Sequence, residues 1–330
     1  MVIDQTLPQV TYKIAVVIPC YRVKAKILDV ISQIPAFVHI IYIVDDACPD
    51  QSGKYVADHC QDSRIHILYH SQNLGVGGAM ITGYQQALAD NCHIIAKLDG
   101  DGQMDGNLLP EFVTPILEGQ ADYTKGNRFH VVESLQGMPI KRIIGNALLS
   151  CVTKLSSGYW HVFDPLNGYT CISASVLKLL PLTKISKGYF FESDMLFRLN
   201  TLRAVVVDIP MVAIYGNEKS NLSVWHNVLP FMRGHIQNFG KRIIYNYFLR
   251  NFSLASLELF FGLILFFFGV FFGLYRWSES AISGHVNSTG TVMIAVLPII
   301  MGFQLLMAFL NYDVSNQPIR PISRFLSQSG

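Results

Sequence analysis

The chain has 330 residues, of which 51% are hydrophobic and 15% charged, and its formal net charge is +2. A charge this small, without a stripe of arginines and interleaved aromatic residues, argues against nucleic acid as a partner. The average combines a soluble-looking part with a strongly apolar C-terminal part. The cysteines are scattered without a Cys-x-x-Cys pair, which predicts reduced thiols and a cytosolic environment.

The first part of the chain alternates short apolar runs with helical patterns. Continuous β-branched or apolar runs predict strands over residues 14–18, 40–44, 65–69 and 94–98, and residues 78–89 predict a helix. Strands that alternate with helices indicate an α/β domain with a mainly parallel sheet.

Polar residues follow three of these predicted strands. Pro19 and Tyr21 follow the first strand, Asp45 and Asp46 the second, and an acidic run, residues 99–103, the fourth. Because ligands of parallel sheets bind beyond the carboxyl ends of the strands, we expect these residues to line one site.

The acidic run, Asp99-Gly100-Asp101-Gly102-Gln103, has the chemistry of a divalent-cation site. Its two carboxylates and the Gln103 amide are oxygen ligands suited to Mg²⁺ or Mn²⁺, which keep waters and bridge to substrate phosphates. The glycines beside Asp101 leave room for a diphosphate. The alternative is a solvated turn, in which Asp and Gly are common.

A glycine-rich segment, residues 73–79, also admits two interpretations. Glycines before a helix can bring backbone amides to a phosphate, which would indicate dinucleotide binding. That fingerprint belongs in the first strand-to-helix turn, whereas this segment follows the third strand. We therefore favour close packing of a loop against a helix.

The C-terminal part contains two long apolar stretches, residues 252–275 and 291–310. Crossing a bilayer needs roughly 20 apolar residues, so both stretches predict transmembrane helices. Residues 226–250 mix apolar and basic residues at helical spacing, which predicts helices on the membrane surface. The basic residues flanking the pair of spans are Arg233, Lys241, Arg242, Arg250, Arg320 and Arg324, against Arg276 alone in the loop between them.

This distribution of basic residues predicts that both ends of the hairpin face the cytoplasm. We accordingly predict a cytoplasmic domain, residues 1–225, interfacial amphipathic helices, residues 226–250, and a transmembrane hairpin with a short cytoplasmic tail, residues 251–330.

Six short motifs in order along the chain form a recognisable set. They are Ile18-Pro19-Cys20-Tyr21, residues 43–50 (IVDDACPD), Asn73-Leu74-Gly75, residues 99–103 (DGDGQ), Gly126-Asn127-Arg128-Phe129 and residues 164–169 (DPLNGY). Together they resemble family 2 glycosyltransferases with the Rossmann-like GT-A fold. Within that family they are most similar to the polyprenyl-phosphate glycosyltransferases, such as dolichol-phosphate mannose synthases and bactoprenol-phosphate glucosyltransferases.

The resemblance implies roles for residues on the donor side. Pro19, Tyr21, Asp45 and Asp46 would bind the nucleoside of a nucleotide sugar. Asp99, Asp101 and Gln103 would hold the metal ion and the diphosphate.

It also implies an acceptor side. Arg128 would grip a lipid phosphate, with Arg142, Asn146 and Lys219 as possible companions. Asp164 and the pair Glu192 and Asp194 match acids near the acceptor. Structural ion pairs are the alternative for Arg128, Asp164 and Asp194.

Three departures from the family pattern limit this assignment. The usual Tyr-Asn-Glu reads Tyr21-Arg22-Val23, which puts the base contacts in question. Residues 216–220 resemble the phosphate-side loop of relatives only loosely, so the role of Lys219 stays open. The chain has no Gln-x-x-Arg-Trp motif, which argues against a processive polysaccharide synthase.

The predicted activity is inverting, metal-dependent transfer of one sugar from a UDP- or GDP-linked donor to polyprenyl phosphate, at the cytoplasmic face of a bacterial inner membrane. A phosphate monoester has a second pKa of about 6 and is already a nucleophile at neutral pH, so it needs no strong base. This agrees with the lack of an obvious His or Lys base beside the acidic run. Transfer to a glycolipid hydroxyl, an inactive membrane-anchored scaffold subunit and homo-oligomerisation stay open.

Overall fold

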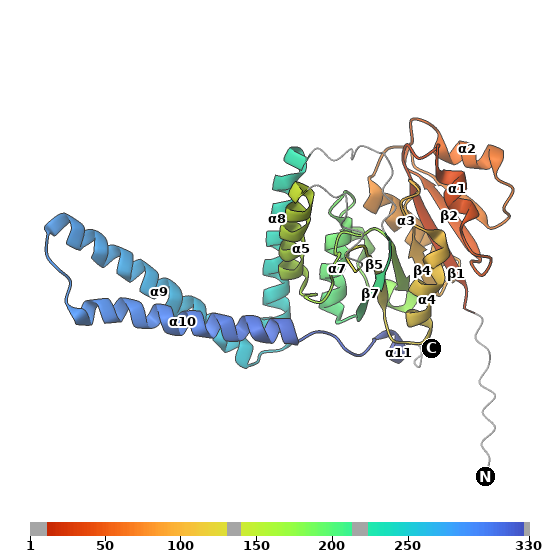
Figure 1. The fold of residues 1–330 in the computed structure, drawn as a ribbon. Coiled ribbons are helices and arrows are strands. Elements are labelled where there is room, and N and C mark those ends of the chain that lie inside the picture. Colours follow the sequence, from red (N-terminus) through yellow and green to blue (C-terminus); the bar gives the residue numbers. More distant parts are fainter. Residues whose placement is uncertain (1–11, 131–139, 213–223, 327–330) are drawn as a thin grey trace, which may run out of the picture. The chain divides into compact units, whose positions relative to one another are not determined.

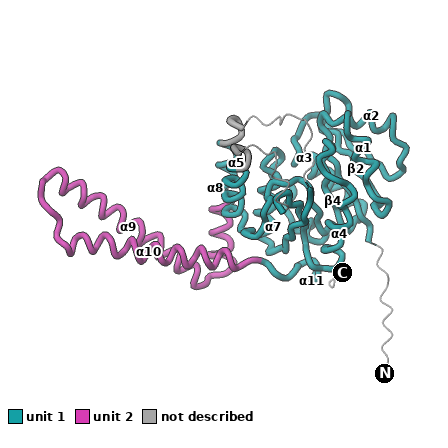
Figure 2. Tube along the Cα trace, viewed as in Figure 1, with its two compact units in different colours: residues 1–238, 318–330 teal, residues 239–317 magenta. Residues whose placement is uncertain are grey.

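The computed structural model describes residues 12–130, 140–212 and 224–326. The chain divides into two compact units (Figure 2), one formed by residues 1–238 and 318–330, the other by residues 239–317. The three-part division into residues 1–225, 226–250 and 251–330 stays a prediction.

The described strands of the first unit form a seven-stranded sheet in the order β3-β2-β1-β4-β6-β5-β7 (Figure 1). The strands are β1 (Ile14–Cys20), β2 (Ile40–Asp45), β3 (Ile65–Tyr69), β4 (Ile94–Lys97), β5 (Tyr123–Asn127), β6 (Thr170–Ser173) and β7 (Val206–Pro210). Only β6 runs antiparallel to its neighbours β4 and β5. The predicted α/β class with a mainly parallel sheet is therefore confirmed.

Successive strand residues point to opposite faces of the sheet, and in β1 the residues on both faces are apolar. Helices therefore cover both faces. Val16 and Ile18 of β1 pack with α1 (Ile27–Ser32), α2 (Ser52–His59) and α4 (Leu109–Leu117). Ala15 and Val17 face the other core, with α3, α6 and α7. These three helices span Val76–Ala89, Ala174–Leu177 and Phe191–Leu202. Helix α5 (Ile140–Ser157) contacts α7.

The glycine-rich segment 73–79 serves close packing, as the sequence favoured. A Cβ on Gly77 would lie 2.2 Å from the carbonyl oxygen of Ser186, and Gly75 has φ of +82°. Side chains at these positions would push the loop before α7 away from the start of α3.

The chain leaves the first unit along α8 (Val224–Ile244), which continues as a π-helical segment, η4 (Tyr245–Arg250). The C-terminal segment belongs to the first unit again and includes α11 (Ser323–Leu326). The buried carboxylate of Asp122, just before β5, accepts the amides of Ile322 at 3.0 Å and Ser323 at 2.8 Å. It also accepts the amide of Val205 at 2.8 Å.

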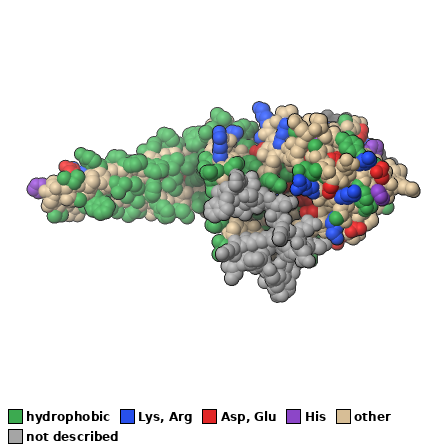
Figure 3. Space-filling model, turned by 90° about the horizontal axis from the view of Figure 1, so that it is seen from above, with side chains coloured by type: hydrophobic (Ala, Val, Ile, Leu, Met, Phe, Trp, Pro, Cys, Tyr) green, Lys and Arg blue, Asp and Glu red, His purple; other side chains and the backbone are tan. Residues whose placement is uncertain are grey.

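The second unit includes the long helices α9 (Leu254–Ser283) and α10 (Thr289–Ser315), which pack against each other. Each is long and apolar enough to cross a membrane, with a mean hydropathy of 2.4 over 18 residues. Hydrophobic side chains cover much of the hairpin (Figure 3). The helices approach closely at Gly302, where a Cβ would lie 2.5 Å from the backbone nitrogen of Phe266.

Candidate active site

The acidic run follows β4 at the carboxyl edge of the sheet, as predicted. The side chain of Asp99 is 29% exposed, and its Oδ1 lies 2.8 Å from Nζ of Lys97, the last residue of β4. Asp101 accepts the amide of Gln103 at 3.0 Å, and Gly102 between them has φ of +77°. The run is thus a tight turn that presents two carboxylates and an amide.

Lys97 was not expected to take part in this site. Its ammonium group is buried and also lies 3.2 Å from Glu192, in the first turn of α7. Burial disfavours the charged form, but Asp99 and Glu192 outweigh it and raise the pKa of Lys97. A lysine therefore lies beside the acidic run, but it is held as a cation by two carboxylates and is not a candidate base.

The loop of residues 164–169 reaches the same edge because β6 is antiparallel. Thr170, where β6 begins, pairs with Lys97 of β4 and with Lys125 of β5. The loop before β6 therefore lies where the neighbouring strands end. A Cβ on Gly168 would lie 2.5 Å from both Asp99 Oδ2 and Lys97 Nζ, so a larger residue here would displace these side-chain ends.

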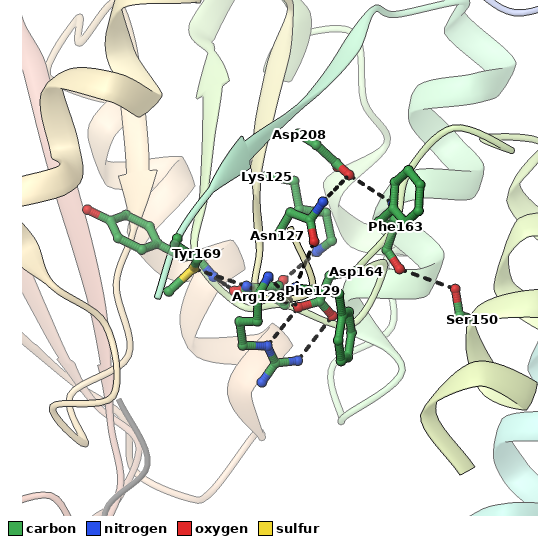
Figure 4. A network of polar contacts seen from close by, with 11 residues as sticks. Lys125, Asn127, Arg128, Phe129, Ser150, Phe163, Asp164, Tyr169 and Asp208 are labelled. Carbon is green, nitrogen blue, oxygen red and sulfur yellow. Dashed lines mark hydrogen bonds and ion pairs between the residues drawn. The ribbon is translucent and has the colours of Figure 1, made fainter. Parts of the chain in front are cut away.

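Arg128 and Asp164 form a bidentate ion pair at this edge (Figure 4). Arg128 follows β5, and its Nε and Nη2 donate to the two oxygens of Asp164 at 2.7 and 3.1 Å. Asp164 is 2% exposed, whereas Arg128 is 28% exposed. The carboxylate therefore fixes the orientation of a guanidinium group that still reaches the surface.

Further hydrogen bonds hold the loop that carries Asp164. Asn167 donates to Asp164 at 3.3 Å, and its carbonyl accepts the ammonium of Lys125. Asp208 accepts the amide of Phe163 at 2.8 Å, next to Asp164 (Figure 4). Burial lowers the pKa of Lys125 to about 8, although Glu192 and Asp164 act in the opposite direction.

Asp45 and Asp46 are buried and shape loops. Asp45 accepts the amides of Cys48 and Gly53, both at 2.7 Å. Asp46 accepts the amides of Leu74 and Gly75, both at 2.8 Å. Their contacts order the loops that follow β2 and β3, and nucleoside binding by either carboxylate stays a prediction.

The structure describes the side chains of three of the remaining predicted site residues and leaves two side chains outside its described part. Tyr21 is 43% exposed just beyond β1, and Pro19 is partly exposed within that strand. Asn146 is partly exposed on α5. Lys219 and the side chain of Arg142 lie outside the described residues.

Asp194 has partners other than Arg128 and Asp164. Its carboxylate accepts Arg198 Nε at 3.0 Å, the amide of Ser186 at 2.9 Å and Asn238 at 3.0 Å. Of the two acids of α7 that were expected near the acceptor, Glu192 is the one that contacts Lys97, the partner of Asp99.

Sequence reasoning missed the two buried lysines at this edge. Lys97 interrupts an otherwise apolar strand, and Lys125 occupies the middle of β5. A lysine inside a strand that is buried on both faces is rare unless it is paired, so each was a signal of a buried counter-charge.

The comparisons with known proteins agree with this architecture. The sequence pattern of Glycosyl transferase family 2 matches residues 15–180. The chain belongs to this family and is a glycosyltransferase.

Two relatives with assigned activities act on lipid phosphates. The UDP-N-acetylglucosamine–dolichyl-phosphate N-acetylglucosaminyltransferase of Methanococcus voltae is 28% identical over 216 residues, which cover 61% of this chain and 86% of that protein. The undecaprenyl-phosphate mannosyltransferase of Micrococcus luteus is 28% identical over 176 residues, 53% of this chain and 71% of that protein.

A solved structure shares the fold. Glucosyl-3-phosphoglycerate synthase from Mycobacterium tuberculosis, in complex with phosphoglyceric acid, aligns with a TM-score of 0.52 and 19% identity. The alignment covers 70% of this chain and 80% of that one. At this level of identity the likeness establishes the GT-A fold alone.

Proposed function

We propose that this protein transfers one sugar, with inversion, from a nucleotide sugar to polyprenyl phosphate at a membrane surface. The observation that carries the proposal is the meeting of the acidic run and the Arg128–Asp164 pair at one edge of the sheet, joined by the loop of residues 164–169. The acidic run suits a diphosphate leaving group, and the Arg128–Asp164 pair suits a phosphate acceptor. Relatives that act on dolichyl and undecaprenyl phosphate support the acceptor class.

The acidic run fits a divalent cation of the Mg²⁺ or Mn²⁺ type. Asp99, Asp101 and Gln103 offer oxygen atoms at the end of a strand. Within the described part of the chain there is no group of three or more His, Cys, Asp and Glu residues that could hold a metal by themselves. Such a sparse donor set suits Mg²⁺ or Mn²⁺, which retain waters and take ligands from substrate phosphates. When bound, the cation would neutralise charge that develops on the leaving diphosphate.

Arg128 would hold the acceptor. A phosphate monoester is a dianion near neutral pH, and a guanidinium group matches two of its oxygens. Asp164 fixes the direction of that group, so the phosphate would be oriented toward the sugar without a large rearrangement. Arg142, Asn146 and Lys219 stay candidates for further contacts.

The pairing of the nearby acids favours a phosphate acceptor over a hydroxyl. A hydroxyl must lose a proton to a general base during transfer. Asp164 is paired with Arg128, Glu192 with Lys97 and Asp194 with Arg198. These ion pairs already engage all three carboxylates, whereas a phosphate dianion needs no base.

The hairpin supports a membrane location. Helices α9 and α10 would anchor the enzyme beside isoprenoid lipids. We propose that residues 226–250 lie on the cytoplasmic surface, because they combine apolar and basic side chains on a helix.

A transfer assay tests the proposal. Membranes containing the protein would be incubated with a panel of radiolabelled UDP- and GDP-sugars, with and without added polyprenyl phosphate, and lipid extracts separated by thin-layer chromatography. We expect one sugar to enter a lipid product only when polyprenyl phosphate is present. A product formed equally well on a phosphate-free glycolipid would favour the hydroxyl acceptor, and no transfer from any donor would favour a scaffold subunit.

A further inference from the structure

Lys97 links two acids that belong to different elements. Its ammonium lies 2.8 Å from Asp99 at the end of β4 and 3.2 Å from Glu192 on α7. The exposed fractions of the side chains are 1% for Lys97, 12% for Glu192 and 29% for Asp99. Lys97 is therefore buried beneath the more exposed Asp99, and its second partner, Glu192, is also less exposed than Asp99.

Asp99 has little freedom to turn away from Lys97. Oδ1 contacts the ammonium, and Oδ2 faces the backbone of Gly168, where a Cβ would lie 2.5 Å away. The carboxylate is consequently held in one orientation by a cation on one side and a loop on the other. Any divalent cation that binds Asp99 must share this carboxylate with Lys97.

Glu192 controls how much of the positive charge acts on Asp99. Two cations that share one carboxylate repel each other, and in a partly buried site this repulsion is only weakly screened by water. Glu192 offsets the charge of Lys97 from behind. The fully buried Lys125 adds further positive charge nearby, so this offset matters more.

We propose that Lys97 and Glu192 are a positioning pair for the donor half of the site: Lys97 orients Asp99, and Glu192 sets the affinity of the acidic run for a divalent cation bound with a nucleoside diphosphate. The proposal rests on the proposed metal-dependent function. It assigns roles to two residues that do not themselves bind the cation.

The test compares two variants of the full-length protein in detergent. Glu192→Gln keeps the shape of the side chain and leaves Lys97 paired with Asp99 alone. Lys97→Met with Glu192→Gln removes both charges at nearly constant volume, a replacement that buried ion pairs often tolerate. Glu111→Gln, an exposed acid on α4, is the matched control for the change in net charge.

The readout is Mn²⁺ binding, followed as the loss of the free-ion electron paramagnetic resonance signal, with UDP or GDP present. We expect Glu192→Gln to raise the dissociation constant about tenfold, because the full charge of Lys97 then opposes the metal. The double variant should bind Mn²⁺ more tightly than Glu192→Gln. Glu111→Gln should match the wild type.

Several results would overturn the proposal. Dissociation constants within about twofold of one another for all variants, alongside lower melting temperatures, would show a purely structural pair. A double variant no tighter than Glu192→Gln, or a wild type that binds no Mn²⁺ with either nucleotide, would also contradict it. If the Mn²⁺ dissociation constants change as expected but the protein transfers no sugar to polyprenyl phosphate, the role of the Lys97–Glu192 pair is supported and the proposed function is rejected.

Discussion

Carboxylates gather at the carboxyl edge of the sheet, and their partners divide them into two kinds. Asp45 and Asp46 accept backbone amides and so order loops, and Asp46 also lies 2.7 Å from the imidazole Nδ1 of His70. Asp99 and Asp164 contact cationic side chains and remain at the edge where a substrate would bind. Sequence position alone does not separate these kinds, because all four residues lie at the end of a strand, just beyond one or in a loop beside one.

The first prediction concerns Asp101. Asp101→Ala removes a hard oxygen ligand from the acidic run and should lower turnover by about a hundredfold or more, roughly 2.7 kcal/mol of transition-state stabilisation. The measurement is the rate of sugar transfer at saturating Mg²⁺ or Mn²⁺. Unchanged turnover, or full wild-type activity in excess chelator, would remove the metal role.

The second prediction concerns Arg128. Arg128→Lys keeps the charge but loses the planar fork that pairs with Asp164, so use of the acceptor should be impaired while nucleotide binding is retained. Transfer rates at rising polyprenyl-phosphate concentration report the first effect, and calorimetry with the nucleotide the second. The reverse pattern, weaker nucleotide binding with an unchanged acceptor dependence, would assign Arg128 to the donor.

At the scale of elements, β6 is the strand that assembles the site. Its reversed direction brings the loop of residues 164–169 to the edge where β4 and β5 end. Gly168 can then touch Asp99 while Asp164 holds Arg128. The acidic run, residues 99–103, and the loop of residues 164–169 are far apart in the sequence but lie side by side at this edge of the sheet.

A third prediction tests the docking of the C-terminal segment. Asp122→Ala leaves the amides of Val205, Ile322 and Ser323 without their acceptor and should lower the free energy of unfolding by about 2–4 kcal/mol. Thermal unfolding of the detergent-solubilised protein measures this. Asp58→Ala, at an exposed position on α2, is the control. Equal melting temperatures for the two variants would mean that this contact contributes no stability.

A fourth prediction concerns pH and the contact between α5 and α8. His235 is buried, its Nδ1 lies 2.8 Å from Ser156 Oγ, and burial lowers its pKa from 6.5 to about 4. Between these values the unfolded chain binds a proton that the folded protein does not, so stability falls as the pH drops from 6.5 toward 4. We expect this group to account for about 3 kcal/mol between pH 7 and pH 4.

Unfolding free energies at pH 7 and near pH 4 check this expectation. His235→Gln should lose less stability over the window than the wild type, whereas His59→Gln, at an exposed position on α2, should behave like the wild type. A His235→Gln protein with the wild-type pH profile would show that this histidine does not carry the effect.

At the scale of the whole molecule, the chain leaves the first unit along α8 and joins it again at residue 318. Ile322 and Ser323 bind Asp122 of that unit, so the segment after α10 must lie on the same side of a membrane as the catalytic domain. An even number of crossings between them satisfies this requirement, and the proposed α9–α10 hairpin would supply two.

The fifth prediction follows from this topology. Protease added to inverted vesicles should digest the catalytic domain and an epitope at the C-terminus, while right-side-out vesicles protect both. A periplasmic protein and a cytoplasmic protein serve as controls for vesicle orientation. Digestion of only one of the two segments from a given side would exclude a hairpin, and digestion of both from the outside would reverse the predicted orientation.

The sequence by itself determined the fold class, the family resemblance and the two long apolar helices. Strands buried on both faces read as continuous apolar runs, and membrane-spanning helices need long apolar stretches, so both leave a local pattern. The same holds for the acidic run, whose carboxylates are neighbours in the chain.

Only the tertiary structure decided which side chains act together. Lys97 and Glu192 are 95 residues apart, and Arg128 and Asp164 are 36 apart, so no local spacing could pair them. The Arg128–Asp164 pair depends on the reversed direction of β6, which brings the loop before β6 to the end of β5, and the Lys97–Glu192 pair joins the end of β4 to the first turn of α7. A buried charge must find its partner in space, and the order of the strands sets what lies nearby.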